Sequence, residues 1–299
     1  MGGWWSTSIR LATQGAVDQA ATTYGGCVPR PSPDDHPPVH PPTPEQFFAA
    51  LDVGSAPRDL VALGGRLDVA TLTAAYRHGC FPWPASEQDE RAQDRAFRRL
   101  ARRGQVPLLP GAATGVLVPW CSTEPRAVLV AEQVTPSRTL RQVLRRSGWT
   151  TTMDTAFPQV LVGCAAREET WITGAMRAAY VDLFAAGIAH SVEVWDGADL
   201  VGGLYGVLTG RIFSGESMFH RVSGAAKVAV IDLCDRLLEV GAPLVDVQQE
   251  TELLTSLGAV LIARAEYVQL AGALRDSPVQ LPTDRRPVDR LASRFGQPV

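Results

Sequence analysis

The sequence predicts an α+β fold for the second half of the chain, because three features follow one another along it. Three apolar segments, HSVEVWDG, DLVGGLYGVLTG and RIFSGESMF, are joined by turn residues at 196–197 and 209–210, which predicts an antiparallel meander. A long apolar helix with one polar stripe is predicted over 225–240. One further strand, LVDVQ at 244–248, follows the helix.

The chain divides by composition into four parts. Residues 1–42 are rich in proline and poor in large apolar side chains, so we expect a disordered N-terminal extension. Residues 43–135 are expected to form a small N-terminal α+β domain, with a charged insertion at 86–113. The denser pattern of residues 136–275 predicts the catalytic domain, and the proline-rich residues 276–299 predict a loose tail.

The remaining elements follow from periodicity and from glycine positions. A helix is predicted over 70–78 and ends at Gly79, and the apolar run at 127–131 predicts a strand. The charged stretch 87–105 is read either as an inserted helix or as a mobile loop. Further helices are predicted over 138–147, 155–165 and 174–186.

Composition limits the protein class. The 299 residues are 45% hydrophobic with a net charge of −3, which suits one or two globular domains, each with its own core. No apolar run reaches the roughly 18–20 residues of a membrane helix, and the N-terminus turns polar before a signal peptide could develop. The five cysteines are scattered without a C-x-x-C pair or a histidine pattern, which argues against a zinc site or a disulfide framework. We therefore expect reduced thiols in a cytoplasmic protein.

Three polar side chains stand inside otherwise apolar strands. Glu216 lies in RIFSGESMF, where an ionised carboxylate would be costly to bury without a partner. Asp246 and Gln248 are two residues apart, and positions i and i+2 of a strand face the same way. These residues predict either a functional cleft or a hydrogen-bonded network in the core.

The cationic charge comes almost entirely from arginine, since Lys227 is the only lysine. Two groups of arginines are clustered, one over 95–103 and one over 138–146. The second group repeats every three or four residues and so forms a basic face on one helix. Such a face is either solvated or binds phosphate. Because the chain is acidic overall, we do not expect a general nucleic-acid binder, although one nucleic-acid end could be held.

The loop RVSGAAK, at 221–227, fits the pattern R-x-x-G-x-A. The meander, helix and final strand resemble the fold of the GCN5-related N-acetyltransferases, in which such a loop holds the pyrophosphate of coenzyme A at a helix N-terminus. In the other reading, Gly224 is simply a turn residue.

Longer strings resemble one family closely. They include LVALGGRLDVATLTAAYRHGCFPW, PWCSTEPRAVL, SRTLRQVLRR, ETWITGAMRAAYVDLFAAGIAHSVEVWDGADLVGGLYGV, FSGESMFHRVSGAAKVA and VDVQQETELLTSLGAVLIARAEY. In this order, over roughly residues 57–270, they resemble the bacterial leucyl/phenylalanyl-tRNA–protein transferases. The string HSVEVWDGADLVGGLYGV followed by GESMF is especially specific.

The resemblance implies transfer of Leu, Phe or, less well, Met from aminoacyl-tRNA to the N-terminal Arg or Lys of acceptor proteins, which marks them for degradation by the N-end rule. It further implies an acetyltransferase-like catalytic domain, no metal or coenzyme, and a cytoplasmic monomer. Two alternatives stay open: an acyl-coenzyme A-dependent N-acyltransferase, and a catalytically inactive relative that acts as a binding protein.

The resemblance also assigns site residues. It implies Asp246 and Gln248 as the catalytic pair and Glu216 as the residue that meets the cationic end of the acceptor. The apolar pocket for the donor side chain is matched by Leu204, Phe213, Met218, Leu233 and Leu237. Aromatic positions suited to the terminal adenosine are matched by Trp83, Trp171, Tyr76 and Tyr180. The predicted tRNA-binding residues are Arg138, Arg141 and Arg145.

The chain departs from the family at several positions. Arg66 replaces the acid of a GGDL motif, and Pro119 replaces the first of two tryptophans. Leu253, with Thr251 two residues earlier, stands where the family has a histidine. The inserted charged stretch is also unusual.

Overall fold

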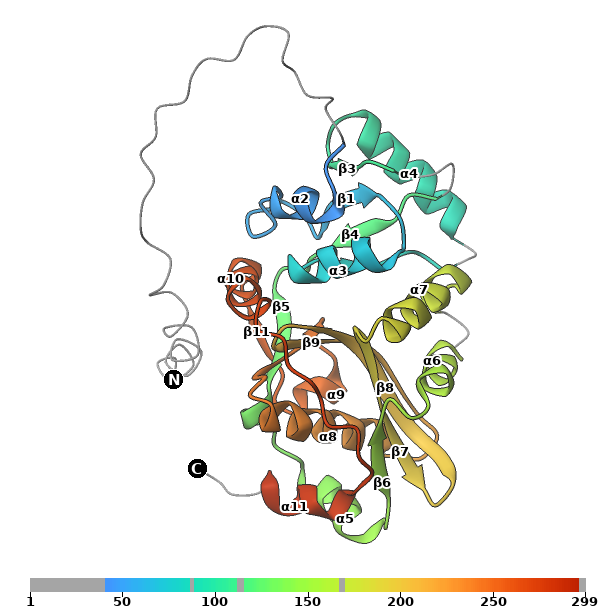
Figure 1. Ribbon diagram of the computed structural model, residues 1–299, viewed down its shortest axis with the longest axis vertical. Helices are drawn as coiled ribbons and strands as arrows, with labels where there is room; N and C mark the ends of the chain where they lie inside the picture. The colour runs from blue at the N-terminus through green and yellow to red at the C-terminus, as the bar shows by residue number, and fades with distance from the viewer. Residues whose placement is uncertain (1–40, 87–88, 112–115, 167–169, 296–299) are drawn as a thin grey trace, which may run out of the picture. The chain divides into compact units, whose positions relative to one another are not determined.

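The fold is described from a computed structural model that covers residues 41–86, 89–111, 116–166 and 170–295 (Figure 1). The predicted N-terminal extension therefore lies outside the described residues, apart from its last two. Residues Pro44–Val299 form one compact unit.

Most of the described strands join one eight-stranded sheet, in the order β11-β5-β10-β9-β8-β7-β6-β12. Its centre is the predicted antiparallel meander of β7 (Ala189–Asp196), β8 (Asp199–Thr209) and β9 (Ile212–His220). Strand β10 (Leu244–Gln248) runs parallel to β9 and antiparallel to β5 (Arg126–Val130). The α+β class is confirmed.

The sequence did not predict the outer strands of this sheet. These are β6 (Thr150–Met153), β11 (Val260–Ile262) and the two-residue β12 (Arg286–Pro287). They are short, so little periodicity is available to detect them. Strand β5, which the sequence grouped with the N-terminal region, pairs with β10 and β11 in this large sheet.

A second sheet holds four described strands in the order β2-β4-β1-β3. They are β1 (Leu60–Gly64), β2 (Phe81–Pro82), β3 (Leu108–Leu109) and β4 (Pro119–Cys121). The indole of Trp120 is fully buried here, donates its Nε1–H to the carbonyl of Gly64 at 2.9 Å, and meets the Phe48 ring edge-on. This tryptophan therefore anchors the small sheet, and Pro119 beside it begins β4.

The helices agree with the sequence to within two residues. The predicted ones are α3 (Val69–Arg77), α5 (Arg138–Arg146), α6 (Phe157–Ala165), α7 (Gly174–Ala185) and α8 (Ala225–Glu239). The charged stretch is a helix, α4 (Glu90–Arg102). The other α-helices of the described residues are α2 (Pro44–Ala49), α9 (Glu252–Thr255), α10 (Arg264–Leu274) and α11 (Leu291–Arg294). In the described part of the chain, none of the helices has the length and apolar content needed to cross a membrane.

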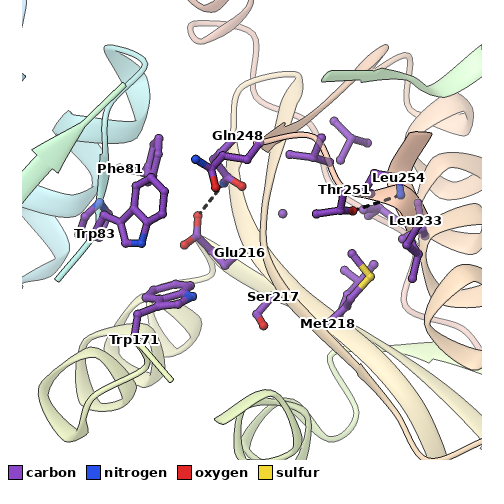
Figure 2. Close-up of a pocket in the computed structure, with 18 residues that line it drawn as sticks. Phe81, Trp83, Trp171, Glu216, Ser217, Met218, Leu233, Gln248, Thr251 and Leu254 are labelled. Atoms are coloured by element: carbon purple, nitrogen blue, oxygen red, sulfur yellow. Dashed lines mark hydrogen bonds between the residues drawn. The ribbon is translucent and has the colours of Figure 1, made fainter. Parts of the chain in front are cut away.

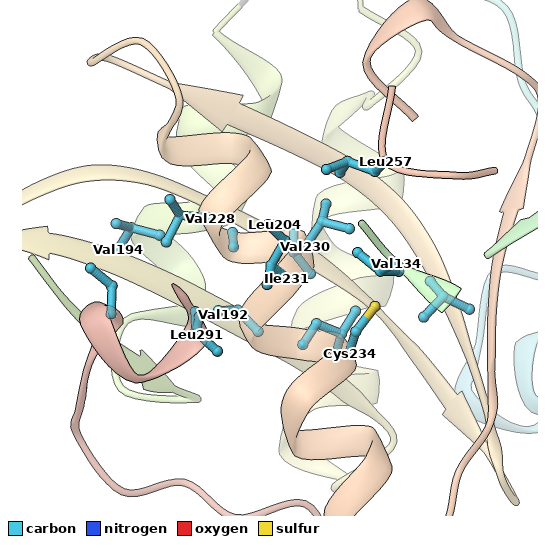
Figure 3. Close-up of a cluster of buried hydrophobic side chains, with 14 of the residues drawn as sticks. Val134, Val192, Val194, Leu204, Val228, Val230, Ile231, Cys234, Leu257 and Leu291 are labelled. Atoms are coloured by element: carbon cyan, nitrogen blue, oxygen red, sulfur yellow. The ribbon is translucent and has the colours of Figure 1, made fainter. Parts of the chain in front are cut away.

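The largest core lies around α8. Figure 3 shows Val228 and Ile231 of this helix among side chains of the meander, including Val192 and Val194. The polar stripe of α8 is buried as well: the side chains of Asp232 and Arg236 are 0% exposed and form an ion pair at 2.7 Å. Helix α8 is thus covered on both sides, which explains its nearly continuous apolar sequence.

The C-terminal tail is not loose, and that prediction was wrong for residues 276–295. Strand β12 pairs with β6, and the side chains of Val288 and Leu291 are buried against the main core. Arg290 and Arg294 form ion pairs with the acidic side chains of Asp232 and Asp235 on α8. The prolines suggested a flexible tail, whereas Arg290 pairs with an acid that lies 58 residues earlier in the sequence.

Candidate functional site

A pocket of about 500 Å³ lies at the meeting point of β9, β10, α8, α9 and β2 (Figure 2). Its inner wall is apolar and is formed by Leu204, Met218, Val230, Leu233, Val245, Val247, Leu253 and Leu254. Aromatic side chains of Phe81, Trp83 and Trp171 line another part of it. Between the two walls, Figure 2 shows the side chains of Glu216 and Gln248 facing each other.

Irregularities in two neighbouring strands aim these polar side chains at the pocket. In β9, Ser217 pairs with Tyr205 and Gly215 pairs with Gly206, which leaves Glu216 as the extra residue of a bulge. In β10, the register shifts between Asp246 and Gln248. Bulges re-aim side chains beside functional sites, and here they turn one carboxylate and one amide toward the same space.

The predicted common face of Asp246 and Gln248 is wrong. Gln248 has a φ of +55°, in the left-handed region that a non-glycine residue rarely adopts. Together with the bulge at Val247, this breaks the alternation of side chains along β10. Gln248 consequently lines the pocket, whereas Asp246 lies behind it with 0% of its surface exposed.

Glu216 is held by a chain of hydrogen bonds. Its Oε2 accepts from the Tyr180 hydroxyl at 2.7 Å, and that hydroxyl lies 2.7 Å from the hydroxyl of Tyr76. Its Oε1 accepts from Nε2 of Gln248 at 3.2 Å. Burial raises the pKa of Glu216 to about 7, with the nearby Asp246 charge adding to the shift and the tyrosine hydrogen bonds opposing it. This carboxyl group therefore changes charge near neutral pH.

The two tyrosines stay protonated in this network. Burial and the neighbouring Glu216 charge raise the pKa of both Tyr76 and Tyr180 well above the ordinary value for a phenol. The family resemblance implies that both tyrosines belong to the adenosine wall. The structure puts them beneath Glu216 instead, both fully buried, so their role here is to orient its carboxylate.

Asp246 belongs to a buried ion pair. Its two carboxylate oxygens accept from Nε and Nη2 of Arg126 at 2.7 and 2.6 Å, and Tyr267 donates its hydroxyl at 2.8 Å. The backbone N–H of Gln248 donates to Asp246 Oδ1 at 3.0 Å. Asp246 thus fixes the backbone of Gln248 at its unusual φ rather than reaching the pocket.

Arg126 is the main residue of the site that sequence analysis missed. It begins strand β5 and is 1% exposed, with its guanidinium against the rings of Phe81 and Tyr267 at 4.8 and 4.3 Å. The available signal was an arginine directly preceding an apolar strand in PRAVL. Its partner Asp246 lies 120 residues away in sequence, so the pairing itself was not visible.

The other predicted pocket residues divide into two groups. Leu204, Met218, Leu233, Trp83 and Trp171 line the pocket. The side chains of Phe213 and Leu237 are instead fully buried in the core and do not reach it. Leu253, one of the departures from the family, adds apolar surface to the pocket, while Thr251 accepts from the N–H of Leu254 and starts α9.

The predicted basic face on α5 is partly available. Arg138 and Arg145 are exposed, whereas Arg141 is half-buried and donates to the carbonyl of Phe295 at 3.4 Å. Leu140 and Leu144 bury the opposite side of the helix. The loop RVSGAAK opens directly into α8, with Gly224 at a φ of +91° just before the first helical residue.

Within the described residues, no group of three or more His, Cys, Asp or Glu side chains could hold a metal ion. Cys80 and Cys121 are buried, and burial raises the pKa of each thiol to about 12. Neither thiol is therefore a nucleophile at neutral pH.

Comparisons with known proteins point to one family. The family model described as "Leucyl/phenylalanyl-tRNA protein transferase" matches residues 128–272, and the model of that family's N-terminal domain matches residues 65–90. A leucyl/phenylalanyl-tRNA–protein transferase of Pseudomonas syringae pv. syringae is 43% identical over 226 residues, which are 74% of this chain and 86% of that protein. Proteins of the same name from Pseudomonas putida and Shewanella baltica are 40% and 39% identical, over 74% and 75% of this chain and 88% and 84% of theirs.

Among solved structures, a conserved protein of unknown function from Bacteroides thetaiotaomicron aligns with a TM-score of 0.33 and 12% identity, over 54% of this chain and 58% of that one. This similarity is too low to assign a fold family. The acyl-coenzyme A-dependent alternative is not favoured by these relatives.

Proposed function

The chain belongs to the leucyl/phenylalanyl-tRNA–protein transferase family, and we propose that it moves Leu, Phe and, less well, Met from aminoacyl-tRNA to the N-terminal Arg or Lys of acceptor proteins. It is accordingly an aminoacyltransferase. The acceptor preference and the marking of the product for N-end-rule degradation belong to the proposal.

One observation carries this proposal: an apolar pocket of about 500 Å³ adjoins the Glu216–Gln248 pair. A pocket lined by Leu204, Met218 and Leu233 suits an uncharged, apolar side chain. With a leucyl or phenylalanyl group there, the reacting ester would lie beside the polar pair.

The chemistry requires little beyond positioning and proton transfer. The acceptor's α-amine forms a bond to the aminoacyl carbonyl carbon while the ester bond to the terminal ribose of the tRNA breaks. The amine loses a proton and the ribose oxygen gains one. Because the ester is already activated and an α-amine has a pKa of about 8, no strong base is needed at neutral pH.

Glu216 and Gln248 carry these steps in the proposal. Glu216, with its pKa near 7, takes the amine proton and returns it toward the leaving oxygen, and its negative charge attracts a cationic acceptor. Gln248 donates a hydrogen bond from Nε2 to Glu216. The side-chain oxygen of Gln248 is then available to accept a hydrogen bond from the attacking amine. Asp246 acts as a positioning residue, through its bond to the backbone of Gln248.

The tRNA end has two sets of contacts in the proposal. Trp83 and Trp171 offer aromatic faces for the terminal adenosine, and their position on the pocket wall supports this role. Arg138 and Arg145 offer exposed guanidinium groups for phosphates. Arg141 contributes less, because it is engaged at the carbonyl of Phe295.

The proposal also includes an acetyltransferase-like arrangement of the catalytic part. It is supported by the meander β7–β9, by the parallel pair of β9 and β10, and by α8 connecting that pair. We propose a monomer acting in the cytoplasm, where charged tRNA is available.

A transfer assay tests the function. Purified protein is incubated with leucyl-tRNA carrying labelled leucine and with a peptide that begins with arginine. Label should move to the peptide's N-terminus, and an otherwise identical peptide with an acetylated N-terminus is the control. Acetyl-coenzyme A should neither compete nor acetylate the peptide. Acetylation without any use of charged tRNA would instead establish the acyl-coenzyme A reaction.

A further inference from the structure

Helix α4 carries an exposed face made only of arginine. On a helix of 3.6 residues per turn each residue advances by about 100°, which puts five arginines within an arc of roughly 100°. They are Arg91, Arg95, Arg98, Arg99 and Arg102. Along the axis this face extends about 16 Å, from the rise of about 1.5 Å per residue. The helix has five arginines against two acids, a net charge of +3, in a chain whose net charge is −3.

The opposite face of α4 is fixed to the protein, so the arginine face has a defined orientation. Phe97, Leu100 and Ala101 pack against the small core that includes Leu63 and Leu117. The Asp94 carboxylate also accepts from the backbone N–H of Leu117 at 3.0 Å. None of these anchoring contacts uses the exposed arginines.

Most of these guanidinium groups have no ion-pair or hydrogen-bond partner among the residues that the structure describes. Arg98 pairs with Asp94 at 2.7 Å. Among the described residues, no ion pair or hydrogen bond involves the side chain of Arg95, Arg99 or Arg102. A row of like charges on one side of a pinned helix is electrostatically unfavourable unless a polyanion neutralises it.

The location of α4 connects it to the donor site. Trp83 lines the pocket, and two residues later the backbone N–H of Ala85 donates to the side chain of Gln93 on α4 at 2.8 Å. The helix is thus tied to the strand that forms the pocket's aromatic wall. Figure 1 shows α4 near one end of the compact unit and α5 near the other, so the two basic faces are separate surfaces.

Apart from its first residue, Glu90, helix α4 is also outside both segments that match the family. The matches cover residues 65–90 and 128–272, and the five arginines of the helix lie between them. Its arginine face is therefore a surface that those two models do not describe.

We propose that the arginine face of α4 is a second contact for the donor tRNA, binding phosphates of the duplex next to the aminoacyl end. Guanidinium groups bind phosphate bidentately, and duplex RNA is recognised largely through its backbone. This inference rests on the proposed function, because the tRNA must have its 3′ end in the pocket. The face adds affinity for the whole tRNA and takes no part in the chemistry.

The test compares two variants with equal change of charge, R95Q/R102Q on the face and R58Q/R66Q away from it. Arg58 and Arg66 are exposed arginines near β1, and glutamine is a good helix former, so both variants should melt like the parent. For R95Q/R102Q, binding of leucyl-tRNA should weaken on the order of tenfold at low salt, and the slope of log Kd against log salt should fall by about 2. R58Q/R66Q should bind like the parent.

A truncated donor separates this face from the catalytic pocket. With leucyl-adenosine, which has no duplex, R95Q/R102Q should transfer leucine at the parental rate. With leucyl-tRNA, its KM should rise while its kcat stays near the parental value.

Three results would overturn the inference. The first is an R95Q/R102Q variant whose tRNA affinity and salt slope equal those of R58Q/R66Q. The second is an equal loss of transfer from leucyl-adenosine. The third is binding to anionic lipid vesicles that depends on Arg95 and Arg102 when tRNA binding does not. A parent protein that neither binds nor uses charged tRNA overturns the proposed function itself, and this inference with it.

Discussion

Replacing Glu216 by glutamine should make the protein more stable at high pH while reducing transfer. The substitution keeps the shape of the side chain and removes its charge. Glutamine can still accept from the Tyr180 hydroxyl, and the amide of Gln248 can rotate to accept from the new NH₂ group. The hydrogen-bond network therefore survives, and the comparison isolates the charge.

The magnitude follows from the pKa of Glu216, which is raised from 4.5 to about 7 on folding. An acid whose folded pKa lies above its unfolded value costs nothing below pH 4.5, because it is protonated in both states. Between pH 4.5 and about 7 the unfolded acid ionises more readily than the folded one, so the free energy of unfolding falls as pH rises. The loss is complete above about pH 7, where it reaches about 3 kcal/mol at 1.36 kcal/mol per pKa unit. At about 2–4 °C per kcal/mol for a domain of this size, the variant should melt roughly 6–12 °C above the parent at pH 8.

Thermal unfolding from pH 4 to pH 8 measures this effect. The difference in Tm between Glu216→Gln and the parent should be near zero at pH 4 and should widen up to pH 8. A Ser217→Ala protein, altered at the neighbouring pocket residue, is the control and should show a difference that does not change with pH. A difference in Tm that stays constant with pH, or a Glu216→Gln protein less stable than the parent at pH 8, would show that the charge of Glu216 does not destabilise the fold.

Four further substitutions probe other parts of the structure. Gln248→Ala should lower transfer on the order of 10²-fold and cost less than about 1 kcal/mol in urea unfolding; near-parental transfer would remove Gln248 from the mechanism. Asp246→Asn should cost on the order of 3 kcal/mol, because Arg126 keeps a buried charge without its counter-ion, and a parental Tm would contradict the ion-pair account. Leu233→Phe should lower kcat/KM for phenylalanyl-tRNA more than for leucyl-tRNA, by about tenfold, and an unchanged ratio would argue against the pocket. Leu291→Ala should cost about 2–4 kcal/mol, whereas a loose tail would give no change.

Short-range sequence patterns predicted much of the fold. The turns at 196–197 and 209–210 gave the meander, and Ser137, whose hydroxyl accepts from the N–H of Leu140 at 3.2 Å, marks the start of α5. Part of the pocket lining could be predicted in the same way, because Leu204 and Met218 occupy opposite positions on the paired strands β8 and β9. Signals of this kind depend only on nearby residues.

The rest depended on pairings between distant segments. The bulge that separates Asp246 from Gln248 arises from the register between β10 and β5, and periodicity within one strand does not reveal it. The role of Asp246 likewise depends on Arg126, 120 residues earlier. The packed tail depends on Arg290 and Arg294 meeting acids on α8, which composition alone could not indicate.

We expect the donor's apolar side chain to lie in the pocket beside Glu216 and Gln248. A structure of the protein bound to a non-hydrolysable amide analogue of leucyl-adenosine tests it directly. The leucyl group should contact Leu204, Met218 and Leu233, with the carbonyl beside Gln248 and the adenine against Trp83 or Trp171. An analogue bound with its adenosine at the RVSGAAK loop, and with no leucyl group in the pocket, would show that the pocket does not hold the donor side chain.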